Sequence, residues 1–342
     1  MPTAHSWSVV GRRSFAAFFL VLLPLAPSLL LAPLGLGAAT GTFALGAAAG
    51  LIAGLLVSGR FGVAVAAAVG VANAVAVPAA PYAILAGLVM ATVAMLYGMT
   101  ARRGITAIIV VAPESVAFTL ADPSQVLANG SVLANALVVG GVALVGGLWG
   151  AGAGAIVGTR LTHKKPVRAS TRRAVTFAVV MATVTGVTMA IVVSMQLQHG
   201  GAWILLTIFV VAQPALHQTW SRSLERLLGT VLGFAIALAI SQVVKQPAVV
   251  VTLGLLFVAL AVFLHLDPKR RYWQFTMMLT PGIVLVEGSG SSVVSTDLAR
   301  LWFTFVGAAI ALVVVAILRW ALGPDGPAEA HPDGEKATPL SQ

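Results

Sequence analysis

The sequence predicts an all-α polytopic membrane protein with twelve transmembrane helices. Hydrophobic residues make up 59% of its 342 residues and charged residues only 9%, whereas about a quarter of the residues in a soluble domain are charged. Apolar runs close to the roughly 20 residues needed to cross a bilayer recur along the whole chain. They show no strict alternation of apolar and polar residues, so the pattern favours helices over a β-barrel.

The expected spans form two sets of six. The first set covers residues 14 to 34, 38 to 57, 61 to 77, 82 to 99, 104 to 121 and 132 to 158. The second set covers residues 174 to 197, 201 to 217, 224 to 243, 248 to 265, 272 to 288 and 299 to 320. The predicted regions are therefore a cytoplasmic N-terminus (1–13), a first repeat (14–158), a basic linker (159–173), a second repeat (174–320) and a disordered tail (321–342).

The positions of the basic residues give an independent test of this topology. If the N-terminus is cytoplasmic, 18 of the 20 lysines and arginines lie in cytoplasmic segments, and only Lys245 and Arg300 lie outside. One span more or fewer would reverse every later loop and destroy this partition. Both termini are therefore predicted to be cytoplasmic. A cleaved signal peptide after Arg12 and Arg13 is the less favoured alternative, because the apolar run continues into further spans.

The two sets of spans show the same order of landmarks. Arg103 precedes Pro113 by ten residues (113 − 103), and Arg271 precedes Pro281 by the same distance (281 − 271). Since six is an even number, both repeats would enter the membrane in the same sense, as parallel repeats about an axis along the membrane normal. The linker between them, 159–173, is basic and contains no acid. Setting topology is its favoured role, and contact with anionic lipid headgroups is the alternative.

The segment 203–233 carries a recognisable series of residues: Trp203, Leu206, Thr207, Pro214, Arg226, Gly229, Thr230 and Gly233. This series resembles the signature of the fusaric acid resistance (FUSC), or aromatic acid exporter-like, family of membrane transporters. The resemblance implies a six-helix bundle in each half and export of organic anions such as aromatic carboxylates. No equivalent series occurs near residues 40 to 62, so the first half departs from the pattern.

Small residues recur every four positions in several spans. The series are Gly46, Gly50 and Gly54; Gly62, Ala66 and Gly70; Gly146, Gly150, Gly154 and Gly158; and Gly229, Gly233, Ala237 and Ser241. Such spacing exposes the backbone on one helix face and lets helices approach closely. Plain packing is the favoured interpretation, and sliding of these faces during transport is the alternative.

Several residues are candidates for lining a substrate path: Gln213, Pro214, Arg226, Gly229, Thr230, Gly233, Thr280, Pro281 and Arg300. The prolines at 214 and 281, each inside or at the end of an expected span, predict breaks in the helices. Unwound backbone in a membrane usually lines a cavity. Arg226 would supply positive charge for an anion, although positive charge at the cytoplasmic end of a helix explains it equally well. For Arg300, a local ion pair with Asp297 is the favoured interpretation.

Glu114 is the only acid placed well inside an expected span, past the midpoint of 104–121. Charged groups are costly at that depth and usually face protein or a water path. Proton coupling is therefore one hypothesis. The favoured interpretation is a carboxylate that is bonded to backbone freed by Pro113 or that lies near the outer mouth.

Other classes of function have little support in the sequence. The chain has no cysteine and no GxxxxGK[ST] phosphate loop, and His265 with Asp267 lacks a third metal ligand, so no enzyme activity, cofactor or metal is expected. The net charge of +10 is spread between apolar spans, which argues against binding of nucleic acid.

The expected function is secondary transport in the cell (plasma) membrane, with export of small organic anions that is coupled to protons or uncoupled. A passive organic-anion channel is the alternative, since plant malate channels look like relatives of this fold, and a membrane scaffold without transport is a third. The expected partners are the lipid bilayer and a small organic anion. A homo-oligomer is compatible with the sequence, which does not define the oligomeric state.

Overall fold

The computed structural model describes residues 34–123, 130–158, 168–212, 216–244, 246–265, 270–287 and 293–322, together with residues 27, 31 and 127. Within these ranges all regular structure is helical. The expected first span at 14 to 34, most of the linker, and the two terminal segments lie outside the described residues. The prediction of an all-helical protein is confirmed.

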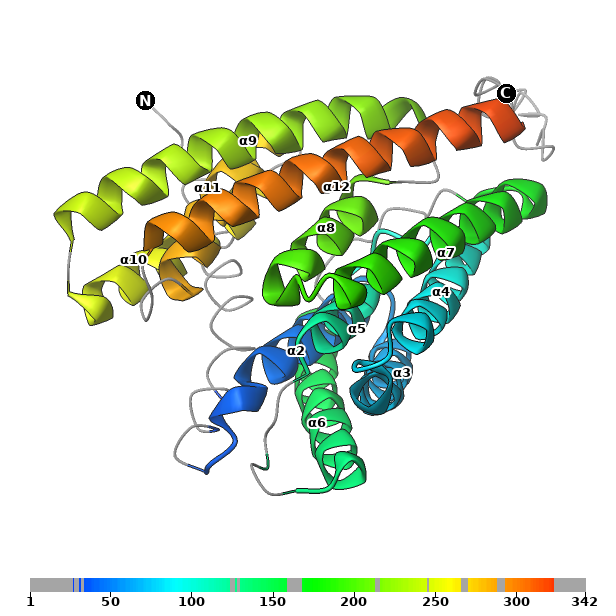
Figure 1. The fold of residues 1–342 in the computed structure, drawn as a ribbon, viewed down its shortest axis with the longest axis horizontal. Helices are drawn as coiled ribbons and strands as arrows, with labels where there is room; N and C mark the ends of the chain where they lie inside the picture. Colours follow the sequence, from blue (N-terminus) through cyan, green and yellow to red (C-terminus); the bar gives the residue numbers. More distant parts are fainter. Residues whose placement is uncertain are drawn as a thin grey trace, which may run out of the picture.

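Five of the helices lie before the linker and six after it (Figure 1). The first group is α2 (Thr40–Leu56), α3 (Gly59–Ala79), α4 (Ala83–Met99), α5 (Val111–Ala121) and α6 (Val132–Gly158). The second group is α7 (Thr171–Ser194), α8 (Gln198–Val211), α9 (Leu216–Val243), α10 (Pro247–His265), α11 (Tyr272–Glu287) and α12 (Val293–Leu322).

Six of the described helices contain stretches long and apolar enough to cross a membrane: Gly59–Ala79, Ala83–Arg103, Val132–Ile156, Thr171–Ser194, Leu224–Val243 and Trp302–Leu322. Shorter apolar helices lie at Thr40–Leu56, Val111–Ala121, Gly200–Val211 and Thr252–Ala261. The chain is therefore a multi-pass membrane protein. Twelve spans in two parallel repeats remain a prediction.

The expected span at 104–121 is wrong as a continuous helix. A short 3₁₀ helix, η3 (Thr100–Arg103), ends at Gly104, which has a positive φ of 70° that favours glycine. The chain then forms turns as far as residue 110, and α5 begins only at Val111. The apolar composition of 104–110 satisfied the hydropathy pattern, but hydropathy does not distinguish apolar turns from an apolar helix.

Small residues bring α2 and α6 into backbone contact, as their spacing predicted. A Cβ added at Gly54 would lie 2.8 Å from the carbonyl oxygen of Ala151, and one at Gly154 would lie 2.5 Å from that of Leu51. Substitutions at Gly50 and Gly150 would meet backbone atoms of the opposite helix even more closely. Close packing is thus the role of these two stripes in the structure.

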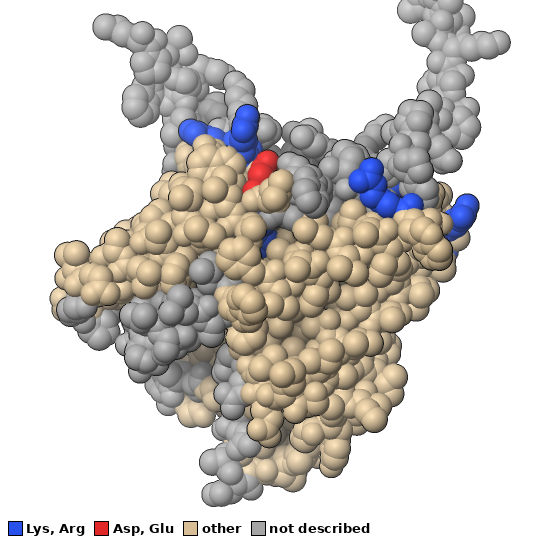
Figure 2. All heavy atoms as spheres, turned by 45° about the horizontal axis from the view of Figure 1, so that its top comes forward, with Lys and Arg blue, Asp and Glu red and all other residues tan. Residues whose placement is uncertain are grey.

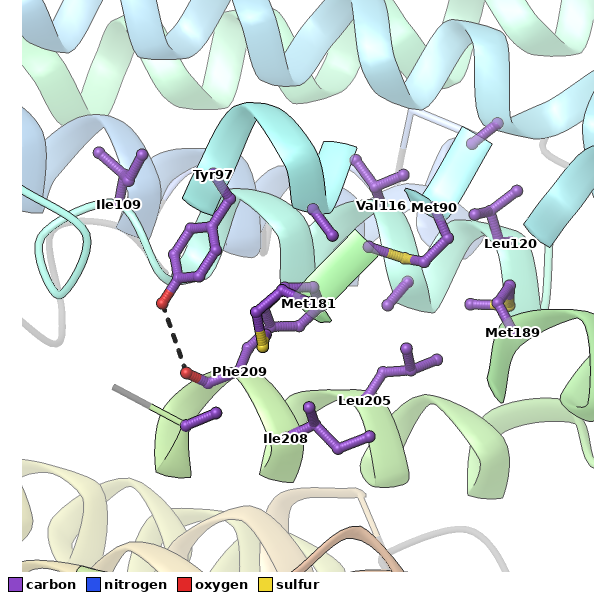
Figure 3. Close-up of a cluster of buried hydrophobic side chains, with 14 of the residues drawn as sticks. Met90, Tyr97, Ile109, Val116, Leu120, Met181, Met189, Leu205, Ile208 and Phe209 are labelled. Carbon is purple, nitrogen blue, oxygen red and sulfur yellow. Dashed lines mark hydrogen bonds between the residues drawn. The ribbon is translucent and has the colours of Figure 1, made fainter. Parts of the chain in front are cut away.

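The two halves meet along α4 and α5 on one side and α7 and α8 on the other. A Cβ at Gly87 of α4 would lie 2.8 Å from the Gly186 carbonyl oxygen of α7, so these two backbones are in close contact. Deeper in the interface, Tyr97 donates a hydrogen bond to the Phe209 carbonyl oxygen at 3.4 Å, and the two rings pack edge to face at 5.2 Å (Figure 3). Phe118 and Trp203 form a second edge-to-face pair between α5 and α8 at 5.7 Å.

Polar and apolar surfaces are separated along the molecule. Lysine and arginine side chains gather along the upper edge of the face shown in Figure 2, and the visible sides below carry few charges. Large apolar side chains are exposed on the outer surface of the helices; Ile84, Leu88 and Leu96 of α4, for example, are 79%, 60% and 66% exposed. Such surfaces suit contact with lipid, where apolar side chains face outward at no cost.

Candidate functional site

Glu114 occupies a buried helix start and not the second half of a span. It lies in the first turn of α5 and is only 6% exposed. One of its carboxylate oxygens, Oε1, is fully buried and has no hydrogen-bond partner among the described residues. A negative charge in the first turn of a helix is stabilised by the unpaired backbone N–H groups there, which carry partial positive charge. The helix start therefore supplies part of the environment that a buried carboxylate requires.

Arg226 lies in α9 and is buried as well, with 7% of its surface exposed. Nη1 of its guanidinium donates a hydrogen bond to the Tyr272 hydroxyl of α11 at 3.3 Å, whereas its buried Nε has no partner among the described residues. The expected span began at residue 224, which placed Arg226 at the cytoplasmic end of a helix, but α9 is helical from Leu216 onward. Arg226 thus points from within a helix into the protein, and exposure at a cytoplasmic surface does not explain it.

These two side chains come from opposite halves of the chain and act on each other. Among the described groups, the charge that attracts the Glu114 carboxylate is the Arg226 guanidinium. Burying either charge alone would be strongly unfavourable, since an isolated ion loses its hydration and gains nothing in return. The sequence identified both residues separately and predicted no interaction between them. Their electrostatic interaction depends on how the halves pack, which the sequence pattern does not reveal.

Three other motif residues, Gly229, Thr230 and Gly233, lie where α9 packs against α11. A Cβ at Gly229 would lie 2.5 Å from the Trp273 carbonyl oxygen, and one at Gly233 would lie 2.6 Å from the Met277 carbonyl oxygen. Thr230 is buried beside them at 9% exposure. These residues allow the two helices to approach closely, and they hold Arg226 at a fixed height along α11.

The predicted break at Thr280 and Pro281 is wrong, because α11 is helical from Tyr272 to Glu287. Proline removes one backbone donor, so the Met277 carbonyl oxygen loses its usual partner four residues later, and this oxygen is the one that faces Gly233. The Thr280 hydroxyl donates to the Thr276 carbonyl oxygen at 2.9 Å. Gly233 therefore lies beside the carbonyl oxygen that the proline leaves without a helical donor, and α11 continues through Pro281 as a helix.

The other candidates are less defined. Gln213 and Pro214 lie outside the described residues, between the end of α8 and the start of α9. Arg300 lies in α12, and its side chain is also outside the described part. Asp267 is outside as well, and no group of three or more metal-ligating side chains occurs in the ranges that the structure describes.

A buried polar cluster beside Glu114 was missed by sequence reasoning. Asn73 of α3 is fully buried; its amide donates to the Ser115 hydroxyl of α5 at 3.0 Å, and its Oδ1 accepts a hydrogen bond from Thr119. The amide also donates to the Val69 carbonyl oxygen at 2.8 Å. The available signal was a single amide within an otherwise apolar span, which in a membrane usually marks a polar contact between helices.

A hollow on the described surface lies away from these residues. It is lined by Leu96, Met99, Thr100, Arg102 and Arg103 at the end of α4 and in η3. None of the predicted path residues contributes to it. Arginine side chains at a helix end suit headgroups or cytoplasmic ions, so this hollow is a feature of the charged edge and not of the buried site.

Comparison with known proteins places the similarity in the second half. Residues 187–314 match the family model described as fusaric acid resistance protein-like. The match confirms the resemblance. It begins within α7 and ends within α12, so it includes Arg226, the glycines of α9 and Pro281, but not Glu114.

One curated relative is the uncharacterized protein slr1298 of Synechocystis sp., which is 30% identical over 115 residues. The matched region covers 33% of this chain and about 15% of the length of that relative. No solved structure matches the chain significantly. The chain is therefore a helical, multi-pass membrane protein with a FUSC-like second half.

Proposed function

We propose that this protein is a secondary transporter of small organic anions, with Arg226 as the group that binds the anion. The observation that carries the proposal is a guanidinium that is 7% exposed and has an unpartnered Nε, in a helix that lies in a membrane protein. Arginine stays charged under all physiological conditions, and its planar donors match a carboxylate. A buried arginine of this kind is costly unless it has a function or a partner.

Similarity to a family of fusaric acid resistance proteins supports transport, and resemblance to aromatic acid exporters supports aromatic carboxylates as substrates. Export from the cytoplasm, through a plasma membrane with both termini inside, belongs to the same proposal. In this arrangement the basic linker 159–173 contacts anionic headgroups at the cytoplasmic surface. Glu114, opposite Arg226, is the group through which protons would be coupled.

The test is uptake of radiolabelled benzoate and phthalate into everted membrane vesicles, with and without a pH gradient. Vesicles with the wild-type protein should take up more label than vesicles with Arg226→Gln present at equal abundance. Accumulation above the outside concentration supports a transporter, whereas rapid equilibration alone supports the passive channel. Identical uptake by both proteins and by empty vesicles would exclude transport of these anions and favour a scaffold.

A further inference from the structure

We propose that the hollow at the end of α4 binds an anionic phospholipid, with its phosphate on Arg102 and Arg103 and an acyl chain along the exposed surface of α4. This hollow lies at the charged edge of the molecule, and Arg226 is not part of its lining. Binding of the lipid is therefore independent of the proposed transport and goes beyond it.

The lining of the hollow combines basic and apolar side chains. The hollow has a volume of about 460 Å³ and is lined by Leu96 and Met99 together with Thr100, Arg102 and Arg103. Both arginines are exposed. Guanidinium groups bind phosphate oxygens through charge-assisted hydrogen bonds, often two at a time. The lining thus places donors for a phosphate directly beside an apolar wall.

The apolar wall continues along α4. Ile84, Leu88 and Leu96 are strongly exposed, and with Thr92 they form a ridge at intervals of four residues. The Thr92 hydroxyl donates to the Leu88 carbonyl oxygen at 2.9 Å, so its donor is already satisfied within the helix. From Leu96 back to Ile84 the ridge is about 18 Å long. An acyl chain can follow this ridge while its headgroup reaches the arginines.

The hollow also lies where separate parts of the chain meet. The backbone N–H of Ala169 donates to the Ala101 carbonyl oxygen of η3 at 3.0 Å. Nη2 of Arg172 donates to the carbonyl oxygen of Ala321, in the last turn of α12, at 3.5 Å. The start of α7 thus connects η3 of the first half with the end of α12 in the second half.

The segments that meet at this edge have the same sign of charge. Residues 100–103, 168–173 and 319–322 contain no acid. They contain six arginines: Arg102, Arg103, Arg168, Arg172, Arg173 and Arg319. Like charges repel one another, and a bound negative group lowers that repulsion. An anionic headgroup in the hollow therefore stabilises the contact between the two halves at this edge.

A phospholipid suits this hollow better than a wholly polar anion. Free phosphate would leave the apolar wall uncovered. The C-terminal tail, 323–342, contains four acids but no long apolar run. A phospholipid has a phosphate for the arginines and acyl chains for the ridge, and a multi-pass membrane protein is surrounded by such molecules.

The test titrates the detergent-purified protein with phosphatidylglycerol, phosphatidylcholine or glycerol phosphate, and native mass spectrometry counts the bound molecules. We expect phosphatidylglycerol to bind more tightly than either of the other two. Arg102→Gln combined with Arg103→Gln should lower its affinity by about 30-fold, the factor expected when two arginines near an anionic group are removed. Arg270→Gln combined with Arg271→Gln is the matched control, because it removes another exposed pair that does not line the hollow. The control should keep the wild-type affinity.

A second pair of variants tests the apolar wall. Leu96→Gln should lower the affinity for phosphatidylglycerol by about fivefold, because an acyl chain loses part of its apolar contact. Leu137→Gln in α6 is the control, since Leu137 is 64% exposed and Leu96 is 66% exposed. The binding of glycerol phosphate, which has no acyl chain, should be the same in both variants. Arg102→Lys with Arg103→Lys keeps both charges and should retain most of the lipid binding.

The outcomes distinguish a lipid site from general attraction between charges. Equal losses in the two arginine-pair variants overturn the proposal, and so does unchanged binding in the variant of Arg102 and Arg103. Equal affinity for phosphatidylglycerol and phosphatidylcholine also overturns it. Glycerol phosphate that binds as tightly as the lipid shows a phosphate site and contradicts a lipid site. Each of these results leaves the proposed transport standing, because that function is tested by anion uptake that depends on Arg226.

Discussion

Two helices, α5 and α11, follow an Arg-Arg pair at the same spacing from a proline but start at different places. α11 begins at Tyr272, directly after its arginines, and continues through Pro281 to Glu287. α5 begins at Val111, two residues before Pro113, and has only 11 residues. A shared sequence landmark therefore does not guarantee a shared local structure, and the difference lies in what each helix start contacts.

The start of α11 is bonded to α9. Glu225 accepts a hydrogen bond from the backbone N–H of Trp273, and the Tyr272 hydroxyl accepts one from Arg226. In the first half, Gly104 turns the chain, and five of the next six residues are apolar with many branched at Cβ, which lowers their helix propensity. The first half consequently carries a buried helix start with an acid, Glu114, and the second half carries a buried arginine, Arg226, whose charge attracts that acid.

The largest expected effect comes from removing the base. Arg226→Gln leaves Glu114 buried without its countercharge, so the free energy of unfolding should fall by about 3–5 kcal/mol. Adding Glu114→Gln removes the uncompensated charge and should recover most of that loss. Thermal unfolding in detergent of the two single variants and the double variant forms a double-mutant cycle. Additive losses would mean that the two residues do not interact.

A smaller loss of stability is expected when the packing of α9 on α11 is disturbed. Gly233→Ala places a Cβ 2.6 Å from the Met277 carbonyl oxygen, so the helices must separate, at a cost of about 1–3 kcal/mol. Gly141→Ala in α6 is the matched control, because nothing lies within 4 Å of the added Cβ. That control should be neutral or more stable by up to about 1 kcal/mol, owing to higher helix propensity. Equal melting temperatures for both variants would show that the close approach is unimportant.

In the first half, side-chain hydrogen bonds hold α5, so the corresponding test changes Asn73. Asn73→Ala removes the partner of Ser115 and of Thr119 and should cost about 1–3 kcal/mol by leaving buried polar groups unsatisfied. Replacing Asn73, Ser115 and Thr119 together with apolar residues of similar size should recover part of the lost stability. Hydrogen exchange of α5 amides provides the readout. Unchanged protection in Asn73→Ala would contradict the role of this cluster.

The smallest expected changes in stability come from replacing Pro281 and Pro113 with alanine, and the two changes should have opposite signs. Pro281→Ala restores a backbone donor opposite the Met277 carbonyl oxygen and removes the clash of the proline ring with the preceding turn. This gain exceeds the loss through greater freedom of the unfolded chain, so the variant should be more stable by about 0.5–1.5 kcal/mol. Pro113→Ala adds a backbone donor at the third residue of α5, where no carbonyl of the same helix accepts it. The free energy of unfolding should therefore fall by about 0.4–1 kcal/mol, because the unfolded chain gains conformational freedom. Melting temperatures of the two variants should shift in opposite directions. Shifts of the same sign would remove this difference between the helices.

The sequence was sufficient for the helical class and for most helix boundaries, because apolar length and turn residues are local properties. It was not sufficient for α5, since residues 104–110 are as apolar as a helix. Glu114 and Arg226 were each recognisable as costly charges, but their electrostatic interaction depends on packing between segments more than 100 residues apart (226 − 114 = 112). Asn73 was overlooked because one amide attracts little notice in a small-residue span.

The contact between Gly87 and Gly186 restricts how the two halves can move. With a Cβ at Gly87 only 2.8 Å from the opposite carbonyl oxygen, and one at Gly98 even closer to the backbone of Ala178, α4 and α7 lie backbone to backbone. Sliding one helix along the other would drive larger side chains into these positions and force the backbones apart. Rocking about the line of contact preserves both close approaches. The geometry of the α4–α7 seam thus resists sliding and permits rocking.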